Sequence, residues 1–278
     1  MASTMPPSPA PARWRPSPLV RASLGLHAGA VALMLARPSA WPWALGAVLA
    51  DQALLMAAGL TPRSALLGPN WTRLPDAAAS RRQIAITIDD GPDPRITPRV
   101  LDLLDKREAK ATFFCIGERV QRCAELAREI VRRGHSVENH SQRHVNYFSL
   151  LGPRSLVAEI ERAQDTIGIT TGQRPLFFRA PAGLRNPFLD PALSRLGLRL
   201  ASWTRRGFDT LSNGTEAVLC KLTRGLGAGD ILLLHDGHAA LTGKGVPVIL
   251  EVLPRLLDAL EGAQLTPVTL RAALGQTS

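Results

Sequence analysis

The chain has 278 residues, a hydrophobic fraction of 45% and a net charge of +10. This length allows one large domain or two smaller ones, with a substantial buried core. No run of Lys and Arg with interleaved aromatic residues is present, so no nucleic-acid partner is expected. Cys115, Cys123 and Cys220 show no CxxC spacing, and neither a disulfide framework nor a cysteine zinc site is expected.

The N-terminal part is far more apolar than the rest. Residues 1–18 are rich in Pro, Ser and Ala, which predicts a disordered leader. Residues 19–60 hold two apolar stretches separated by the turn Arg37-Pro38-Ser39. Because a bilayer-spanning helix needs about 20 apolar residues, this pattern predicts a transmembrane helical hairpin. A cleaved signal peptide is the competing interpretation.

The flanking arginines predict how the hairpin is oriented. Arginines lie before and after the two apolar stretches, and only Arg37 lies in the turn between them. The positive-inside tendency then puts both ends, and the domain that follows, in the cytoplasm. The expected location is a bacterial inner membrane with a cytoplasmic catalytic domain. Asp51 is expected to face the partner helix or an interface, because a carboxylate facing lipid is costly.

Residues 61–82 contain Pro and Arg and are expected to form a linker, followed by one catalytic domain over residues 83–278. The predicted strands are Ile84–Ile88, Thr112–Ile116, Leu176–Arg179, Leu198–Trp203, Ile231–Leu234 and Gln264–Val268. The predicted helices are Glu118–Arg133, Ser155–Ile167, Thr215–Leu226 and Val246–Leu260. This alternation indicates βα units around a parallel sheet or barrel, with the chemistry at the carboxyl ends of the strands.

Two adjacent carboxylates end the first predicted strand. The run Ile86-Thr87-Ile88 leads into Asp89-Asp90-Gly91-Pro92. Side chains alternate faces along a strand, so the two Asp residues cannot share one role unless the turn re-aims them. The geometry favours a division of labour, in which one carboxylate binds something and the other moves protons. An Asp-rich turn that caps the next helix is the alternative.

Further polar residues stand apart from this pair. His140 and His144 are four residues apart, so on a helix both imidazoles would share one face and reach one cation. With one Asp they form a two-His, one-carboxylate set suited to zinc or another divalent transition metal. Arg179 ends a predicted strand and can hold a carboxylate in its ionised form, or form a surface ion pair.

Two more segments end near predicted strands. Trp203 can wall a groove and stack on a sugar ring, although core packing is the more common use of Trp. His235 emerges from a buried apolar strand into a Gly turn, a position suited to a general acid or to a structural His.

Together the five segments resemble the NodB-homology polysaccharide deacetylases, carbohydrate esterase family 4. The motifs of that family are TFDDGP, HSxxH or HTxxH, RxPxG, a Trp/Asp segment and LxxHD. They are matched in order by Thr87–Pro92, His140–His144, Arg179–Gly183, Trp203–Asp209 and Leu232–Asp236. The resemblance covers about residues 83–270. It implies an α/β fold, a distorted (β/α) barrel of the NodB-homology type, here preceded by the membrane hairpin.

The resemblance also implies roles for particular residues. Asp89 would be the general base and Arg179 would orient it. His235 would protonate the leaving amine, and Asp209 would be a charged partner of His235 or Arg179. The implied metal ligands are Asp90, His140 and His144. The metal is expected to be zinc, with cobalt, nickel or manganese as alternatives.

Substrate binding is expected at Pro181, Ala182, Trp203, Arg205 and Arg206. Two of these positions depart from the family pattern. Ala182 stands where Tyr is common, and its backbone N–H can still stabilise an oxyanion. Arg206 aligns with the usual first Asp of the fourth motif. Arg205 and Arg206 at a groove edge favour a negatively charged substrate such as one carrying phosphate, or are simply solvated surface residues.

The expected activity is that of a metal-dependent hydrolase that removes an N-acetyl group from an amino sugar. The sugar would belong to a polysaccharide, an oligosaccharide or a lipid-linked glycan, and a cytoplasmic domain on a membrane hairpin favours the last. O-deacetylation or deformylation with the same residues is the first alternative. A metal-binding but inactive domain that recognises glycan or scaffolds a membrane assembly is the second.

Overall fold

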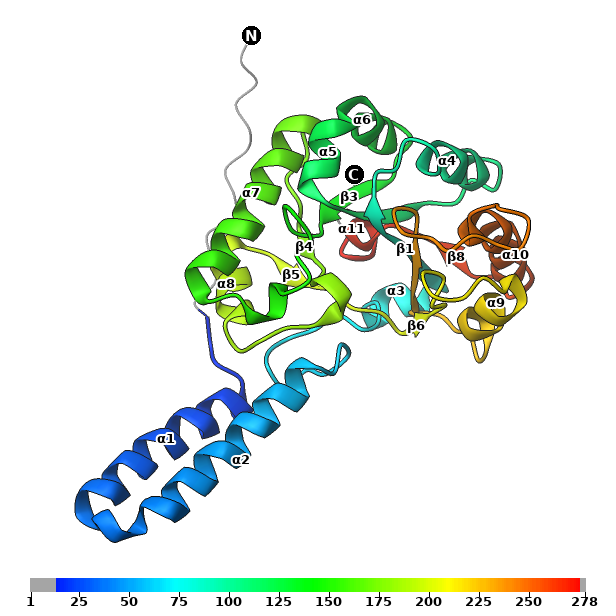
Figure 1. The fold of residues 1–278 in the computed structure, drawn as a ribbon. Coiled ribbons are helices and arrows are strands. Elements are labelled where there is room, and N and C mark those ends of the chain that lie inside the picture. The colour runs from blue at the N-terminus through cyan, green and yellow to red at the C-terminus, as the bar shows by residue number, and fades with distance from the viewer. Residues whose placement is uncertain (1–13, 276–278) are drawn as a thin grey trace.

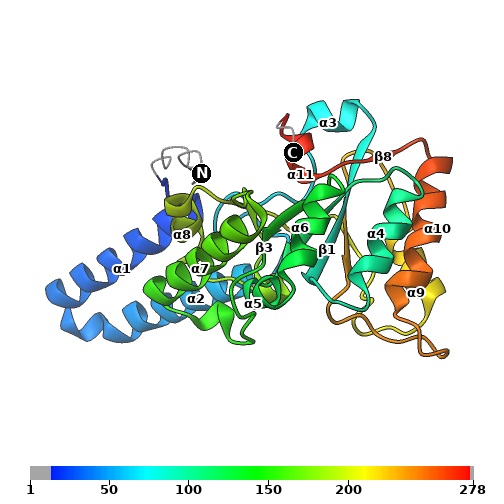
Figure 2. The ribbon, with the colours of Figure 1, turned by 90° about the horizontal axis from the view of Figure 1, so that it is seen from above.

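The structure is a computed structural model that describes residues 14–275. Most of the predicted disordered leader, residues 1–13, lies outside the described residues, as do residues 276–278. Figure 1 shows an α/β domain from which a pair of long helices projects on one side. In the view turned by 90° the helix pair again extends sideways, away from the sheet (Figure 2).

The projecting pair forms the predicted hairpin. Helix α1 (Pro18–Ala36) and helix α2 (Trp41–Gly59) are joined by the short 3₁₀ helix η1 (Pro38–Ala40). Both helices are long and apolar enough to cross a membrane, by length and composition. Asp51 faces the partner helix, as expected, because its carboxylate accepts a hydrogen bond of 2.7 Å from the Ser23 hydroxyl.

A single curled, parallel sheet forms the centre of the domain. Its strand order is β5-β4-β3-β2-β1-β7-β6, and β8 pairs with the start of β1. The strands are β1 (Gln83–Gly91), β2 (Ala111–Cys115), β3 (Ser136–Asn139), β4 (Phe177–Phe178), β5 (Arg199–Leu200), β6 (Arg205–Arg206), β7 (Ile231–His235) and β8 (Thr266–Pro267). The sequence did not predict β3 and β6. The curled parallel sheet forms a half-barrel and confirms the predicted α/β fold, a distorted (β/α) barrel.

Helices connect the parallel strands, and most of them cover the outside of the sheet (Figure 1). They are α3 (Asp76–Ser80), α4 (Thr97–Asp105), α5 (Gly117–Arg122), α6 (Ala124–Arg132), α7 (Pro153–Thr171), α8 (Leu189–Leu196), α9 (Thr215–Thr223), α10 (Val248–Gly262) and α11 (Leu270–Ala273), with 3₁₀ turns η2 (Phe148–Leu150) and η3 (Pro181–Gly183). The prediction of one helix over Glu118–Arg133 was wrong. Cys123 has non-helical angles of φ −122° and ψ 47°, which divide the segment into α5 and α6.

The alternation of side chains along β1 organises two layers of the core. Ile84, Ile86 and Ile88 point outward and pack in the large cluster beneath the helices. Ala85 points inward and belongs to a second cluster inside the curl of the sheet. Because the strand period is 2, Thr87 and Asp89 share the inward side with Ala85. The inside of the curl therefore becomes polar toward the carboxyl end of β1.

The segment of residues 61–82, expected as a linker, packs along the domain. Its Leu67, Leu74 and Ala78 side chains are buried. The backbone N–H of Trp71 donates to the Leu200 carbonyl at 2.9 Å, and the N–H of Leu74 donates to the Gly229 carbonyl at 2.8 Å. The chain between the hairpin and β1 is thus held in place by backbone hydrogen bonds.

A buried ion pair fastens the C-terminal helix to the sheet. Glu138 on β3 is fully buried, and one of its oxygens lies 2.6 Å from Nε of Arg271 on α11. Its other oxygen accepts backbone hydrogen bonds from Leu176 and Phe177 at 2.7 and 2.9 Å. Burial raises the pKa of Glu138, and the Arg271 guanidinium opposes that rise. The pair therefore joins β3, the start of β4 and α11.

We expect the substitution Arg271→Ala to destabilise the domain, because it leaves the Glu138 carboxylate buried without its cation. Breaking a buried pair in this way costs about 3–5 kcal/mol of unfolding free energy, which lowers Tm by roughly 6–20 °C for a domain of this size. Near-UV circular dichroism of the detergent-solubilised protein measures it. Arg199→Ala on exposed β5 is the control, and equal Tm values for the two variants would contradict the assignment.

Candidate active site

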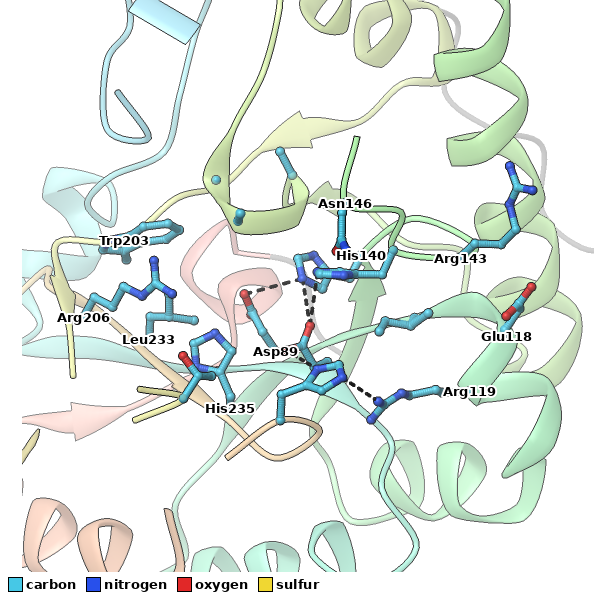
Figure 3. Close-up of a pocket in the computed structure, with 18 of the residues that line it drawn as sticks. Asp89, Glu118, Arg119, His140, Arg143, Asn146, Trp203, Arg206, Leu233 and His235 are labelled. Atoms are coloured by element: carbon cyan, nitrogen blue, oxygen red, sulfur yellow. Dashed lines mark hydrogen bonds and ion pairs between the residues drawn. The ribbon is translucent and has the colours of Figure 1, made fainter. Parts of the chain in front are cut away.

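A pocket of about 490 Å³ opens at the carboxyl ends of the strands. Figure 3 shows side chains from separate strands and loops converging on it. The sequence-predicted residues that line it are Asp89, Asp90, His140, His144, Ala182, Trp203, Arg206 and His235. A cavity of this size suits a small ligand or one sugar unit of a larger one.

A bulge at Asp90 brings both Asp side chains to the pocket. β1 pairs with β2 in regular register as far as Asp89, and the register then shifts before Gly91. Asp90 is the extra residue, and its φ of 73° lies in the left-handed region. A regular strand would have turned Asp90 toward the outer layer. The bulge therefore turns the Asp90 side chain to the same side as Asp89, which is required for both carboxylates to reach one site.

The two histidines converge on Asp90 from a loop. Oδ1 of Asp90 lies 3.3 Å from Nε2 of His140 and 3.3 Å from Nε2 of His144. The expectation that the pair shares a helical face was wrong. β3 ends at Asn139, whose side chain accepts a hydrogen bond from the Ser141 N–H at 2.9 Å and directs the chain into a loop.

The His140 ring is oriented by a backbone carbonyl. Its Nδ1 lies 2.8 Å from the carbonyl oxygen of Arg179. A carbonyl oxygen only accepts, so Nδ1 carries the proton and Nε2 faces Asp90. A fixed tautomer of this kind is typical of histidines that ligate metals through the other nitrogen.

The charges of this cluster fit a cation. The ligand atoms of Asp90, His140 and His144 all lie within 4.8 Å of one another. Oδ1 of Asp90 is buried and has no hydrogen-bond partner within residues 14–275. Burial disfavours protonated His140, yet its pKa is raised because Asp89 and Asp90 face it. Burial and the neighbouring His140 lower the pKa of His144 to about 4, which leaves a neutral imidazole able to ligate a metal.

Arg179 forms a buried ion pair with Asp89. The Arg179 side chain is buried, and its Nη1 lies 2.6 Å from Oδ1 of Asp89. The same nitrogen donates to the Thr87 hydroxyl at 2.8 Å. Oδ2 of Asp89 lies 3.8 Å from Nε2 of His140. The contact is the one that the family resemblance implies, and it is buried, so the surface ion pair considered for Arg179 is excluded.

His235 lies beside Asp89 and is paired with Asp209. The parallel register of β1 and β7 puts His235 directly opposite Asp89. Oδ1 of Asp209 is 2.8 Å from Nδ1 of His235, and Oδ2 accepts the His235 backbone N–H at 2.7 Å. Of the two partners considered for Asp209, the structure thus identifies His235. Burial disfavours the protonated ring, but Asp209 outweighs it and the pKa of His235 is raised.

Two residues expected to bind substrate do not line the pocket. Arg205 points to the far side of β6, where its Nε lies 2.6 Å from Asp230 and its other nitrogens contact backbone carbonyls. Pro181 is buried at the start of the η3 turn. Adjacent residues on a strand face opposite sides, so only Arg206 of the arginine pair can reach the pocket.

Arg206 lies against two aromatic rings at the pocket wall. Its guanidinium carbon is 5.4 Å from the Trp203 ring centre and 4.9 Å from the Phe208 ring centre. Its Nε is buried without a hydrogen-bond partner in the described part of the chain. The stacked guanidinium keeps donors available to the pocket.

Several lining residues were not anticipated from the sequence. His238, Glu118, Arg119, Arg122, Arg143 and Asn146 complete the wall. His238 follows β7 and Arg119 follows β2. Their positions just after strand ends could therefore have predicted that they reach the pocket. His238 lies 2.9 Å from Oδ2 of Asp90 through its Nδ1.

The comparisons with known proteins agree with this geometry. A family model described as polysaccharide deacetylase matches residues 76–201. A peptidoglycan-N-acetylglucosamine deacetylase of Bacillus cereus is 37% identical over 175 residues, which are 62% of this chain and 81% of that protein. A chitooligosaccharide deacetylase of Bradyrhizobium sp. is 34% identical over 158 residues, 56% of this chain and 72% of that protein.

A solved structure extends the similarity to the fold. The family 4 carbohydrate esterase from Streptomyces lividans, in complex with acetate, is 30% identical with a TM-score of 0.60, covering 66% of this chain and 91% of that chain. A curled parallel sheet with this polar pocket defines the class of carbohydrate-modifying hydrolases that these relatives represent. The chain belongs to the polysaccharide deacetylase family.

The Asp209 contact predicts how His235 responds to pH. The raised pKa keeps the ring protonated as the pH rises past the ordinary His value of about 6.5. In Asp209→Asn the charge is lost and burial prevails, so the ring should deprotonate at lower pH. Histidine ring NMR across a pH series measures this shift. Asn146→Ala serves as the control, and an unchanged His235 pKa in Asp209→Asn would contradict the prediction.

Proposed function

We propose that the chain is a metal-dependent carbohydrate N-deacetylase that removes an acetyl group from an amino sugar. The observation that carries the proposal is that two oriented proton-transfer groups face one pocket. Asp89 is held by Arg179 and His235 by Asp209, and both lie in the pocket that contains the Asp90, His140 and His144 cluster. The deacetylases of peptidoglycan and chitooligosaccharide among its relatives support an N-acetyl sugar as the substrate.

Asp90, His140 and His144 would hold the divalent cation, and zinc suits this nitrogen and oxygen donor set. When bound, the cation would act as a Lewis acid toward the amide carbonyl and make a neighbouring water more acidic. Cobalt, nickel and manganese suit the same donors.

Asp89 would act as the general base. Its Oδ1 is engaged by Arg179, which leaves Oδ2 on the side of the histidine cluster. A water between Oδ2 and the acetyl carbon would transfer a proton to this oxygen as it attacks. The buried guanidinium pairs with the carboxylate and fixes its direction, which positions the base before the reaction.

His235 would act as the general acid toward the leaving amine. Its Nδ1 donates to Asp209, so Nε2 is the nitrogen left for the substrate. An amine leaves a tetrahedral carbon only when protonated, and the raised pKa keeps this proton available near neutral pH. The backbone N–H of Ala182, on the pocket wall, would donate to the developing oxyanion.

The position of the hairpin supports a lipid-linked glycan as substrate. Helix α2 ends at Gly59, and Pro62 follows three residues later beside the pocket-lining residues Gly183 and Trp203. A Cβ on Gly183 would lie 2.6 Å from Trp203 and 2.7 Å from Pro62, so these three residues are in close contact. Three residues span at most about 10 Å, so the pocket wall lies close to the end of the membrane helix.

The outer surface of the hairpin supports its insertion in a bilayer. Large apolar side chains point away from the protein, with Leu35 80% and Trp43 81% exposed. The arginines that flank the hairpin support a cytoplasmic catalytic domain at a bacterial inner membrane. A sugar attached to a lipid would reach such a pocket more readily than a polymer outside the cell.

Arg206 would bind the anionic group of this substrate. A sugar joined to its lipid through phosphate is anionic there, and a guanidinium stacked on aromatic rings is a suitable phosphate ligand. No carboxylate of residues 14–275 forms an ion pair with Arg206. The free donors at the pocket wall support this role for Arg206 rather than simple solvation.

The activity is tested by mass spectrometry of acetylated sugars after incubation with the purified protein. We expect the loss of one acetyl mass from N-acetyl sugars, and none from O-acetyl or N-formyl analogues. If the acyl group is released only from the O-acetyl analogue, or only from the N-formyl analogue, the protein is an O-deacetylase or a deformylase instead. Release from no substrate, including glycolipids, would favour an inactive glycan-binding domain.

Asp89→Asn should separate catalysis from metal binding. Loss of a general base lowers the rate by about 10²- to 10⁴-fold, while the cluster of Asp90 and the two histidines stays intact. We therefore expect bound zinc, measured by plasma mass spectrometry, to equal that of the wild type. Asp90→Ala should instead lose the metal together with the activity. Full activity in Asp89→Asn would remove Asp89 as the base.

Arg206→Gln should discriminate between charged and neutral substrates. A hydrogen bond to a charged group contributes about 1.5–3 kcal/mol, or about 10- to 150-fold in kcat/KM. This loss is expected for a glycolipid with phosphate and not for a neutral chitooligosaccharide. Equal losses for both substrates would contradict phosphate recognition. Arg199→Ala, on exposed β5, is the control with an equal loss of charge.

A further inference from the structure

His238 forms a second contact to the carboxylate of Asp90, from outside the three-residue cluster. It lies in the turn after β7, and its Nδ1 is 2.9 Å from Oδ2 of Asp90. Its Nε2 is 3.1 Å from Nη2 of Arg119. Figure 3 shows Arg119 reaching toward the pocket from α5, and dashed lines mark these contacts.

The partner of each nitrogen determines where His238 carries its proton. A guanidinium has donors and no acceptor, so Arg119 donates and Nε2 of His238 accepts. The ring proton is then on Nδ1, which donates to Oδ2 of Asp90. Arg119 is itself held, because its Nη1 donates to the Gly237 carbonyl at 3.1 Å. The chain of contacts runs in one direction, from Arg119 through His238 to Asp90.

These contacts leave the two oxygens of Asp90 in different situations. Oδ2 accepts a hydrogen bond from His238, whereas Oδ1 is buried, without a hydrogen bond in the described chain, between the Nε2 atoms of His140 and His144. The Asp90 carboxylate is thereby prevented from rotating.

We propose that His238, held by Arg119, is a positioning residue that directs Oδ1 of Asp90 toward the metal ion and strengthens its binding. The inference rests on the metal site of the proposed function. It assigns no contact with substrate to His238. Hydrogen-bond partners of metal ligands commonly change metal affinity by about 10- to 100-fold when they are removed.

The turn that carries His238 is built for this approach. A Cβ on Gly237 would overlap the Asp90 carbonyl and the Arg119 guanidinium, so only glycine lets the turn come this close to β1. The His238 side chain is 55% exposed, whereas that of Asp90 is 7% exposed. Substitution of His238 therefore removes little buried surface, and the fold should be retained.

The geometry argues against His238 as a further metal ligand. Both ring nitrogens are engaged, Nδ1 as a donor to Asp90 and Nε2 as an acceptor from Arg119. Ligation through Nε2 would require the loss of the Arg119 contact. The two possible roles of His238 therefore predict opposite effects of Arg119. If His238 positions Asp90, the Arg119 contact strengthens metal binding. If His238 is a metal ligand, Arg119 competes with the metal for Nε2.

The test is zinc and cobalt affinity, measured by chelator competition on the full-length protein in detergent. We expect His238→Ala to bind about 10- to 100-fold more weakly, with the same stoichiometry at saturation. Arg119→Gln should weaken binding in the same direction. His238→Asn, which keeps a donor near Nδ1, should recover part of the affinity. Arg132→Ala, an exposed arginine of α6 outside the pocket, is the control and should bind as the wild type.

Three outcomes would overturn the inference. Wild-type affinity in His238→Ala would do so while leaving the proposed deacetylase intact. Tighter binding in Arg119→Gln, with a changed visible spectrum of cobalt in His238→Ala, would make His238 a ligand instead. Absence of metal binding in the wild type would remove the metal site itself and with it this part of the proposed function. The Tm of the metal-free variants should match the wild type, which separates positioning from a general loss of structure.

Discussion

The buried guanidinium of Arg179 is the constraint on which the arrangement of the pocket depends. It donates to Asp89 and Thr87 on β1 and to the carbonyls of Ala201 and Ser202 after β5. Its plane lies over the Phe114 ring, 4.1 Å from the ring centre. A buried cation is tolerated only when its donors are satisfied and a counter-charge is near. The hydrogen bonds of the Arg179 side chain fix the ends of β1, β4 and β5 relative to one another. The backbone carbonyl of Arg179 also fixes the orientation of the His140 ring.

Much of the fold follows from the order of apolar and polar residues along the chain. The alternation of strand-like and helical segments predicted a parallel sheet, and parallel strands bring their carboxyl ends together. That rule alone gathers Asp89, Arg179 and His235 at one edge. Strands β3 and β6 escaped prediction because their residues are mostly polar or charged and show no apolar strand pattern.

The finer geometry of the site depends on features that sequence patterns do not encode. The left-handed backbone at Asp90, Ser141 and His144 is uncommon for such residues, and the surrounding hydrogen bonds impose it. The spacing of the two histidines predicted convergence on one cation, but the convergence arises from a loop. Nothing in the sequence predicts different roles for Arg205 and Arg206. Only Arg206 lines the pocket, because the two side chains face opposite sides of β6. The contact of Arg119 with His238 joins residues 119 positions apart, which no local pattern reveals.

The path of residues 61–82 has a consequence for the exposed edges of the sheet. The curl does not close on itself, since β5 and β6 stand at the two ends of the strand order. Trp71 accepts the Ser202 N–H at 2.8 Å and donates to Leu200, while the Thr72 carbonyl accepts the Thr204 hydroxyl at 2.6 Å. The segment thus occupies hydrogen-bonding positions between the two ends. Open strand edges promote pairing with other chains. A catalytic domain shortened to begin at Gln83 would lack this cover, so the chain leading out of the helical hairpin also protects the curled sheet from aggregation.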